Sequence, residues 1–600
     1  MAAAVVYLLL GVVVWWHLWS GGIGGSLASG SLDPAADVWW LAWVPHALGQ
    51  GDNLLFSRAM YYPAGVNLLA NTSFLLVGLV LSPVTVAAGP VAAFAVAVVL
   101  APAADALCAF LMLRRYVSWA PACFVGGLLY GFGPFVATDL RYGHLNLTVL
   151  VIPPLAVLVM DRILVRRAGS PWLAGSWLAL CVVGEFFVSV EMLGLGVVVV
   201  LCATVVVLVS RRGDWRTGLG YSLRALATAV VLSATALTYP TWWYLSGPRH
   251  FTGAVWGDMT GFAASLASFV QPHGQLFGVS YLSGGNGDFL GVPLLVVLVV
   301  GALMWHGDPA LRFAFTMVLV CGVLALGAEL HVGHAASGVP MPAWLLVHLP
   351  VLSSLAASRF GAYLDLFSGW ALAVVVGHVR GELRDERAGR SSAAAGAAAV
   401  AVAALVSVAL LPPWPYPARR LVEPPVLAAL ARLPAGSVVR EYPLASGTDG
   451  DGLVWQAEAG LSYAVTAGYA IVPGRGGQAT ISATPDAMDL VFAGAAFGRL
   501  TPQNAASLVP VVRRHAFDDH AAAVVVVRDS AGGPQLESLL ARALGPASLS
   551  DRSGALWLSP AHRAHRAHRA HHAGTPSASV CRPVSAGGGG SGCAARAGGG

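Results

Sequence analysis

The sequence predicts an α-helical polytopic membrane protein with a small α/β domain after its last membrane span. Hydrophobic residues make up 57% of the 600 positions and charged residues only 10%, and the mean hydropathy is +0.70. These values exclude a soluble globular chain. The apolar residues gather in runs long enough to cross a bilayer, and this pattern stops near residue 411.

The apolar runs predict about eleven spans of roughly 17–25 residues each. The first run, "AAVVYLLLGVVVWWHLWS", has neither a basic region before it nor a small-residue cleavage site, so we expect a retained span rather than a signal peptide. The expected spans lie at 3–20, 90–113, 118–138, 147–165, 171–189, 191–210, 222–243, 288–306, 311–328, 361–379 and 393–411.

A further run at 73–89, interrupted by "SPVT", decides the orientation of the chain. Arginine-rich loops are expected on the cytoplasmic side of a membrane. If 73–89 does not cross, every later arginine cluster lies on the same side as the N-terminus. We therefore interpret 73–89 as a re-entrant or juxtamembrane element and predict a cytoplasmic N-terminus. The extracytoplasmic loops are then 21–72, 139–146, 244–287 and 329–360.

From residue 412 the chain changes character. Short β-type runs such as "SVVREYP" alternate with helix-like runs such as "QLESLLARAL", which predicts an extracytoplasmic α/β domain over 412–560. The tail at 561–600 has low complexity and is expected to be disordered. It carries five arginines and no acid, which accounts for the net charge of +5. The basic balance is therefore no indication of nucleic-acid binding.

Two carboxylates stand near the start of the first outer loop, in "SLDPAADVWWLAW" at 31–43. Asp33 before a proline is typical of a helix N-cap, and Asp37 would then lie in the first turn, where acids suit the helix dipole. The tryptophans at 39, 40 and 43 fit an aromatic belt at the membrane interface. A carboxylate at the outer boundary could equally accept a proton from a hydroxyl group, and capping does not exclude this role.

Other polar residues of the outer loops are candidates for binding a substrate. "DLRYGHLNL" brings Arg141, His144 and Asn146 together with Asp139, although Arg141 and Asp139 could simply form a surface ion pair. Arg359 stands at the mouth of a span, where a guanidinium suits bidentate contact with a phosphate. Arg249 and His250 are weaker candidates for that task. Of two acids between adjacent spans, we favour Glu191 over Glu185.

The ordered set of these motifs resembles the GT-C superfamily of integral membrane glycosyltransferases, and in particular an actinobacterial branch. It comprises "WWLAWVPHAL", "YYPAGVNLL", "GHLNL", "SVE" and "SRF", in this order over about residues 1–560. The resemblance implies a polyprenyl-phosphate sugar donor, action on the extracytoplasmic side and an acidic general base in the first loop. That role would fall to Asp33, with Asp37 as second candidate. The glycine that the family has before the first Asp is Leu32 here.

The resemblance implies a GT-C-like fold over residues 1–411 and an inverting transfer of one sugar to a cell-envelope glycan or lipid. A divalent cation would be compatible with the superfamily, but the sequence shows no metal-ligand set and no other cofactor motif. Two alternatives stay open: a lipid or glycan flippase, and a non-catalytic envelope-assembly protein that binds a lipid carrier. Against the flippase, no inverted repeat of interrupted helices is visible.

Overall fold

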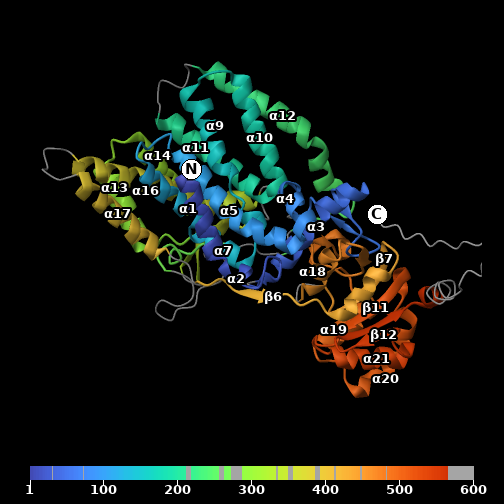
Figure 1. Ribbon diagram of the computed structural model, residues 1–600. Coiled ribbons are helices and arrows are strands. Elements are labelled where there is room, and N and C mark those ends of the chain that lie inside the picture. Colours follow the sequence, from blue (N-terminus) through green and yellow to red (C-terminus); the bar gives the residue numbers. More distant parts are fainter. Residues whose placement is uncertain are drawn as a thin grey trace, which may run out of the picture.

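The computed structural model describes residues 1–564 except 30, 72, 211–217, 254, 256–261, 272–286, 333–334, 349–355, 385–391, 411–413, 446–448 and 482. A large helical part continues into a smaller α/β unit at one end (Figure 1). The tail expected to be disordered lies almost entirely outside the described residues.

The first part of the chain comprises the N-terminal helix, which packs on α5 (Pro90–Leu113), and the elements of the first loop. Its elements are α1 (Ala2–Val14), α2 (Trp16–Trp19), β1 (Ser26–Ala28), α3 (Asp33–Gln50), β2 (Phe56–Ser57), β3 (Val66–Asn67) and α4 (Leu75–Ala88). The run at 73–89 is thus a helix of 14 residues, with Pro83 inside it. It packs on α3, since Gly78 lies against Val44. Its assignment as re-entrant or juxtamembrane stays a prediction.

The rest of the helical part contains the longest apolar helices. The elements are α5 (Pro90–Leu113), α6 (Ala120–Phe132), α7 (Pro134–Tyr142), α8 (Leu145–Thr148), α9 (Ile152–Met160) with the π-helical turn η1 (Asp161–Arg166), α10 (Pro171–Val188), α11 (Val190–Ser210), α12 (Leu219–Ser246), α13 (Gly291–Met304), α14 (Pro309–Ala325), β4 (Glu329–Val332), β5 (Ala335–Pro340), α15 (Trp344–Val347), the 3₁₀ turn η4 (Ala357–Phe360), α16 (Gly361–Arg384) and α17 (Ser392–Ala409).

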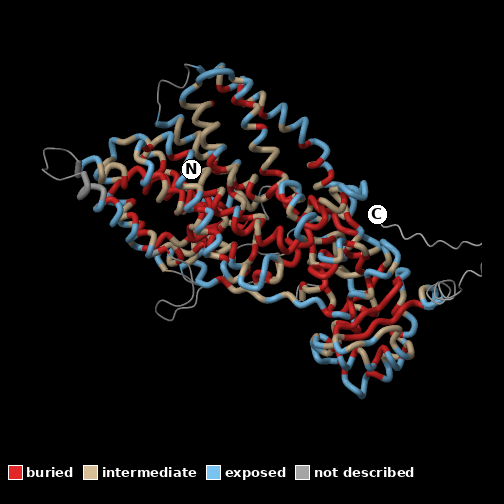
Figure 2. The backbone as a smooth tube through the Cα atoms, viewed as in Figure 1, coloured by how far each residue is buried: buried red, intermediate tan, exposed pale blue. Residues whose placement is uncertain are grey.

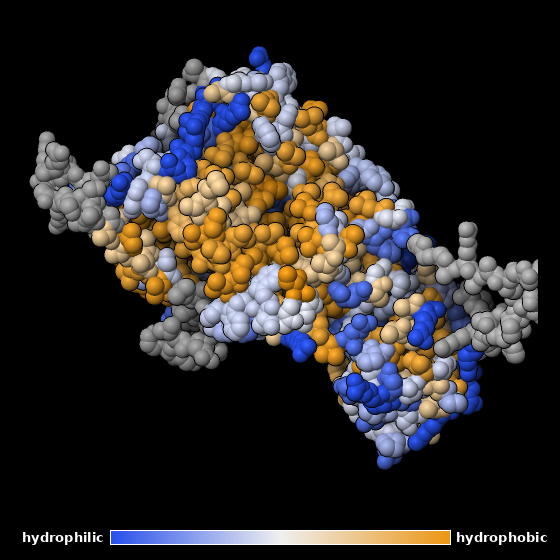
Figure 3. Space-filling model, in the orientation of Figure 1, coloured by the Kyte–Doolittle hydropathy of each residue, from blue (hydrophilic) through white to orange (hydrophobic). Residues whose placement is uncertain are grey.

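Seven helical segments among the described residues are long and apolar enough to cross a membrane, which confirms the membrane character of the chain. Large apolar side chains lie exposed along α10, α11 and α12, among them Trp177, Leu201 and Val230. Figure 3 shows a broad apolar surface over the helical part and a more hydrophilic surface over the α/β unit. Shorter apolar helices, including α1, α4, α13 and α14, lie in other predicted runs. The total of eleven spans and the orientation stay predictions.

The C-terminal unit is built on a five-stranded sheet. The elements of this C-terminal unit are β6 (Ala418–Arg420), the 3₁₀ turn η6 (Pro425–Arg432), β7 (Ser437–Tyr442), α18 (Asp451–Glu458), β8 (Tyr463–Val465), β9 (Val472–Pro473), the turn η7 (Arg475–Gly477), β10 (Ala479–Thr480), α19 (Ala487–Ala496), α20 (Pro502–His515), η8 (Asp518–His520), β11 (Ala521–Val527), α21 (Gly533–Leu544), β12 (Leu549–Asp551) and β13 (Gly554–Leu558). The strand order is β12-β13-β11-β7-β8, with β7 parallel to both neighbours.

The two faces of this sheet belong to different cores, as the two-residue period of a strand requires. Val524 and Val526 of β11 pack under α19, α20 and α21. Val525 and Val527 face the other way, into a core that continues through α18 into the helical part. Figure 2 shows buried backbone along this path. The α/β unit is therefore packed on the helical part rather than tethered to it.

The tryptophans of α3 correct one prediction. Trp39, Trp40 and Trp43 are at most 5% exposed and lie in the protein core, not in an interfacial belt. The reason is that α18 packs on α3, and the Trp39 indole Nε1 donates a hydrogen bond of 2.7 Å to Oε1 of the fully buried Gln456. This contact fixes the α/β unit on the helix that begins with Asp33.

Candidate active site

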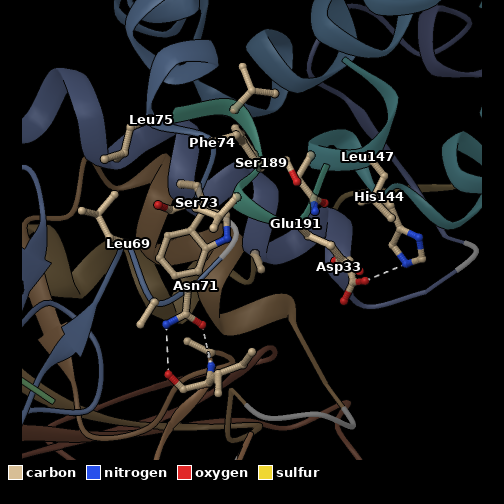
Figure 4. Close-up of a pocket in the computed structure, with 18 of the residues that line it drawn as sticks. Asp33, Leu69, Asn71, Ser73, Phe74, Leu75, His144, Leu147, Ser189 and Glu191 are labelled. Atoms are coloured by element: carbon tan, nitrogen blue, oxygen red, sulfur yellow. Dashed lines mark hydrogen bonds and ion pairs between the residues drawn. The ribbon is translucent and has the colours of Figure 1, made fainter. Parts of the chain in front are cut away.

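A cavity of about 380 Å³ lies where the first loop, the helical part and the α/β unit meet. In Figure 4, Asp33, His144, Ser189 and Glu191 lie toward one side of the cavity, and Leu69, Asn71, Ser73, Phe74 and Leu75 lie toward the other. Residues from widely separated parts of the chain line it. They include Asp33, Asp37 and Trp40 of α3, Asn71 and Phe74 before α4, His144 and Asn146, Ser189 and Glu191 at the junction of α10 and α11, Arg359, and Tyr469 and Ile471.

Asp33 is the first residue of α3 and not its N-cap, which corrects a second prediction. The N-cap position is Leu32, whose side chain makes no capping hydrogen bond. The backbone N–H of Asp33 instead donates to the Ser31 hydroxyl at 3.1 Å. The Asp33 carboxylate therefore does not cap α3, and it lines the cavity.

The turn between α7 and α8 brings His144 to Asp33. Gly143 ends α7 with a φ of 81°, a conformation that favours glycine. A Cβ atom at this position would overlap with the Pro34 ring and would lie 2.9 Å from its Cδ. The glycine therefore permits both the turn and its close approach to the start of α3.

His144 bridges two carboxylates. Its Nε2 lies 2.8 Å from Asp33 Oδ2 and its Nδ1 lies 2.8 Å from Asp139 Oδ1. Burial favours the neutral imidazole, but the hydrogen bonds to Asp139 and Asp33 outweigh it and raise the pKa of His144 to about 10. Both ring nitrogens then carry protons, so an imidazolium links the two acids. Asp139 therefore bonds to His144 rather than pairing with Arg141.

The environments of Asp33 and Asp37 drive their pKa values apart. Burial alone would raise the pKa of Asp33, but hydrogen bonds from His144 and Tyr469 and the charges of His144 and Arg359 lower it. Burial and the nearby Asp33 charge raise the pKa of Asp37 well above its usual range, although Asp37 Oδ2 accepts the Leu145 backbone N–H at 3.1 Å. Asp33 is therefore the ionised acid of the pair at neutral pH.

Glu191 and Arg359 form an ion pair in the lining of the cavity. Glu191 Oε1 also accepts the backbone N–H of Ala356 at 3.2 Å, so this acid fixes both the guanidinium and the chain that leads to it. Arg359 keeps 27% of its side chain exposed. A cation thus stands in the same cavity as the ionised Asp33.

The structure brings six of the residues selected from the sequence into this cavity: Asp33, Asp37, His144, Asn146, Glu191 and Arg359. Arg141 is exposed and does not line it. Arg249 and His250 also lie outside the lining, although the adjacent Phe251 belongs to it. Glu185 lies instead in a separate apolar groove of about 910 Å³ between α9, α10, α11, α12, α14 and α16.

Sequence reasoning missed Tyr469 and Asn71 among the polar residues of the cavity. The Tyr469 hydroxyl donates to Asp33 Oδ1 at 2.8 Å. Asn71 exchanges two hydrogen bonds with the backbone of Ile471, at 2.9 and 2.6 Å. Both connect the first loop with the α/β unit, and no periodicity or motif links segments about 400 positions apart in the sequence.

The described residues contain no cluster of three or more His, Cys, Asp or Glu side chains arranged to hold a metal ion. The carboxylates of Asp33 and Asp139 are instead each hydrogen-bonded to the imidazole of His144. A divalent cation in this cavity stays a prediction.

Comparisons with known proteins give distant similarities only. No family model and no curated protein matches the sequence. Among solved structures, the arabinofuranosyltransferase AftD from Mycobacteria is similar, with a TM-score of 0.47 and 15% identity over 88% of this chain. The alignment covers 35% of AftD, so the chain spans about a third of that protein.

The archaeal oligosaccharyltransferase AglB from Archaeoglobus fulgidus, solved with an inhibitory peptide and a dolichol-phosphate, is also similar. Its TM-score is 0.43 and the identity is 14%, over 91% of this chain and 71% of AglB. At these values we base the function on the cavity and not on the similarity.

Proposed function

We propose that the protein is a membrane glycosyltransferase of the GT-C type, which moves one sugar from a polyprenyl-phosphate donor to a hydroxyl group of an extracytoplasmic cell-envelope glycan or lipid. The observation that supports this best is an ionised carboxylate, Asp33, beside a cation, Arg359, in one cavity at the edge of the apolar helices. The motifs that resemble the GT-C superfamily contribute the polar residues His144, Asn146, Ser189, Glu191 and Arg359 to this lining.

The reaction would use these two charges at opposite ends of the transferred sugar. Asp33 accepts the proton of the acceptor hydroxyl while that oxygen forms a bond to the anomeric carbon. The bond from the anomeric carbon to the phosphate oxygen breaks on the opposite face, and the electron pair leaves with the phosphate. Inversion at the anomeric carbon follows. Arg359 stabilises the charge that develops on the leaving phosphate.

The low pKa of Asp33 has a consequence for this mechanism. It keeps the carboxylate ionised, as a base must be, but it also weakens its basicity. We therefore expect proton transfer to occur late, when departure of the phosphate has already made the acceptor hydroxyl acidic. Asp37, with its raised pKa, would remain protonated and would bear on the reaction through Asp33.

The test is transfer of radiolabelled sugar from polyprenyl-phosphate donors to cell-envelope fractions by the purified protein in lipid vesicles. Asp33→Asn should lower the rate by about 10²-fold or more, the range of general-base catalysis. Asp52→Asn is the matched control, since Asp52 lies in the same loop with a half-exposed side chain and outside the cavity.

Three outcomes would contradict the proposal. Wild-type rates of transfer for both Asp33→Asn and Asp37→Asn would show that neither of these carboxylates is the general base. Movement of labelled lipid across the vesicle membrane without product would instead support a flippase. Binding of the lipid carrier with neither transfer nor movement would support a non-catalytic assembly protein.

A further inference from the structure

The two oxygens of the Asp33 carboxylate are held by different parts of the chain. His144, from the helical part, bonds to Oδ2 at 2.8 Å, and the Tyr469 hydroxyl, from the α/β unit, bonds to Oδ1 at 2.8 Å. One partner on each oxygen fixes the plane of the carboxylate, which a single hydrogen bond would leave free to rotate. The sequence distance from Asp33 to Tyr469 is 436 residues.

The segment that carries Tyr469 is anchored on the first loop at several points. The Tyr61 backbone N–H donates to Ala467 O at 3.1 Å, and the Tyr61 hydroxyl donates to Gly468 O at 2.7 Å. The two hydrogen bonds between Asn71 and Ile471 hold the other side of Tyr469. The tyrosine therefore stands between two fixed points and is not on a free loop.

Close packing at Gly468 helps to fix the position of Tyr469 next to Asp33. A Cβ atom there would lie 2.9 Å from the Tyr61 ring, which is closer than Cβ atoms approach their neighbours, and 3.1 Å from Met60 Sδ, which is a tight contact. The absence of a side chain at Gly468 lets the segment approach the first loop until the Tyr469 hydroxyl reaches Asp33.

We propose that Tyr469 is a positioning residue through which the α/β unit orients the Asp33 carboxylate, so that the helical part alone forms an incomplete active site. This inference rests on the proposed function, because it assigns Tyr469 a role in a reaction that uses Asp33. Tyr469 acts through Asp33 and takes no part in bond making.

The electrostatics of the site agree with this role. Burial and the adjacent Asp33 charge raise the pKa of Tyr469, so its hydroxyl stays protonated and donates. The hydrogen bond contributes to the lowered pKa of Asp33. The charged and titratable groups that act on Asp33 come from every element around it: His144 and, through it, Asp139, then Arg359, Asp37 and Tyr469.

The experiment is a pH profile of sugar transfer by the full-length protein in vesicles, from the labelled polyprenyl-phosphate donor. In Tyr469→Phe, the acidic limb should move to higher pH by about one unit, because one hydrogen bond to the charged form of Asp33 is lost. Transfer at the acidic end should then fall about tenfold relative to wild type. Tyr239→Phe, an exposed tyrosine of α12, should leave the limb in place.

Gly468→Ala is the second variant, because it displaces Tyr469 without removing its hydroxyl group. It should move the acidic limb in the same direction as Tyr469→Phe. Thermal unfolding of each variant, measured in detergent, separates a local change from loss of the fold.

An unchanged acidic limb in both variants would overturn the inference. So would an equal loss of transfer at every pH together with a lower unfolding temperature, since that is a structural role only. A rise in the acceptor KM with an unchanged limb would make Tyr469 a binding residue instead. Asp33→Asn is measured in parallel: wild-type transfer by that variant refutes the proposed function, whereas its inactivity beside an unchanged Tyr469→Phe profile refutes only the role of Tyr469.

Discussion

The turn at Gly143 provides the sharpest test of the site, because one added methyl group should separate His144 from Asp33. Gly143→Ala meets two obstacles. A φ of 81° costs a residue with a side chain about 1–2 kcal/mol. The new Cβ also overlaps with the Pro34 ring, so the turn must move away from α3.

The size of the effect follows from the distance between the two side chains. His144 Nε2 and Asp33 Oδ2 are 2.8 Å apart, and a shift of about 1 Å takes them beyond hydrogen-bond range. Misplacement of this size costs about 10²-fold in rate. We therefore expect Gly143→Ala to lower sugar transfer about 100-fold and the free energy of unfolding by about 1–3 kcal/mol.

The assay is transfer of radiolabelled sugar in vesicles together with thermal unfolding in detergent. Gly220→Ala is the matched control, since a Cβ at Gly220, in helix α12, meets no atom within 4 Å. It should leave the rate unchanged and should stabilise the protein slightly, by about 0.5–1 kcal/mol. A Gly143→Ala variant with wild-type transfer would show that the contact between His144 and Asp33 is not needed, and the reasoning would fail.

Three further predictions concern the phosphate, the packing of the α/β unit and the topology. Arg359→Gln should lower kcat/KM for the lipid-linked donor about 10- to 100-fold, while the exposed Arg141→Gln should not; equal values for both variants would show that Arg359 does not contact the phosphate. Gln456→Leu removes three hydrogen bonds and leaves the buried Trp39 indole N–H without its acceptor, whereas Ala59 O keeps the Val465 backbone N–H. It should lower the free energy of unfolding by about 1–3 kcal/mol, and an unchanged melting temperature would contradict this. Ser507→Cys on α20, in a background in which Cys581 and Cys593 of the tail are replaced, should react with an impermeant thiol reagent in intact cells; no labelling of the folded protein would refute an extracytoplasmic α/β unit.

The helices could be predicted from the sequence because a membrane span depends only on the residues within it. An apolar run of sufficient length must satisfy its backbone hydrogen bonds internally and therefore forms a helix whatever its neighbours. Each predicted run contains a helix in the structure. The sequence also showed that the apolar run at 73–89 is interrupted. In the structure this run forms the short helix α4, with Pro83 inside it.

Only part of the candidate site could be predicted from the sequence. Asp33, His144 and Arg359 stood out because charged residues are rare in this chain. The tryptophans of α3 were misplaced because an amphipathic aromatic residue suits an interface and a core equally, and only the packing of α18 decides between them. Likewise, "DP" is typical of an N-cap, yet Asp33 bonds to His144 and Tyr469 instead.

By itself, then, the sequence determined the membrane class, the helical runs and a short set of candidate charges, since each depends on composition or on spacing within one element. The tertiary structure alone decided which of these charges meet. The bonds from Asp33 to His144 and to Tyr469 join residues separated by more than a hundred and by 436 positions, and spacing within a helix carries no information about partners on another element. The turn at Gly143 sets the contact with His144, and folding of the α/β unit onto the first loop sets the contact with Tyr469.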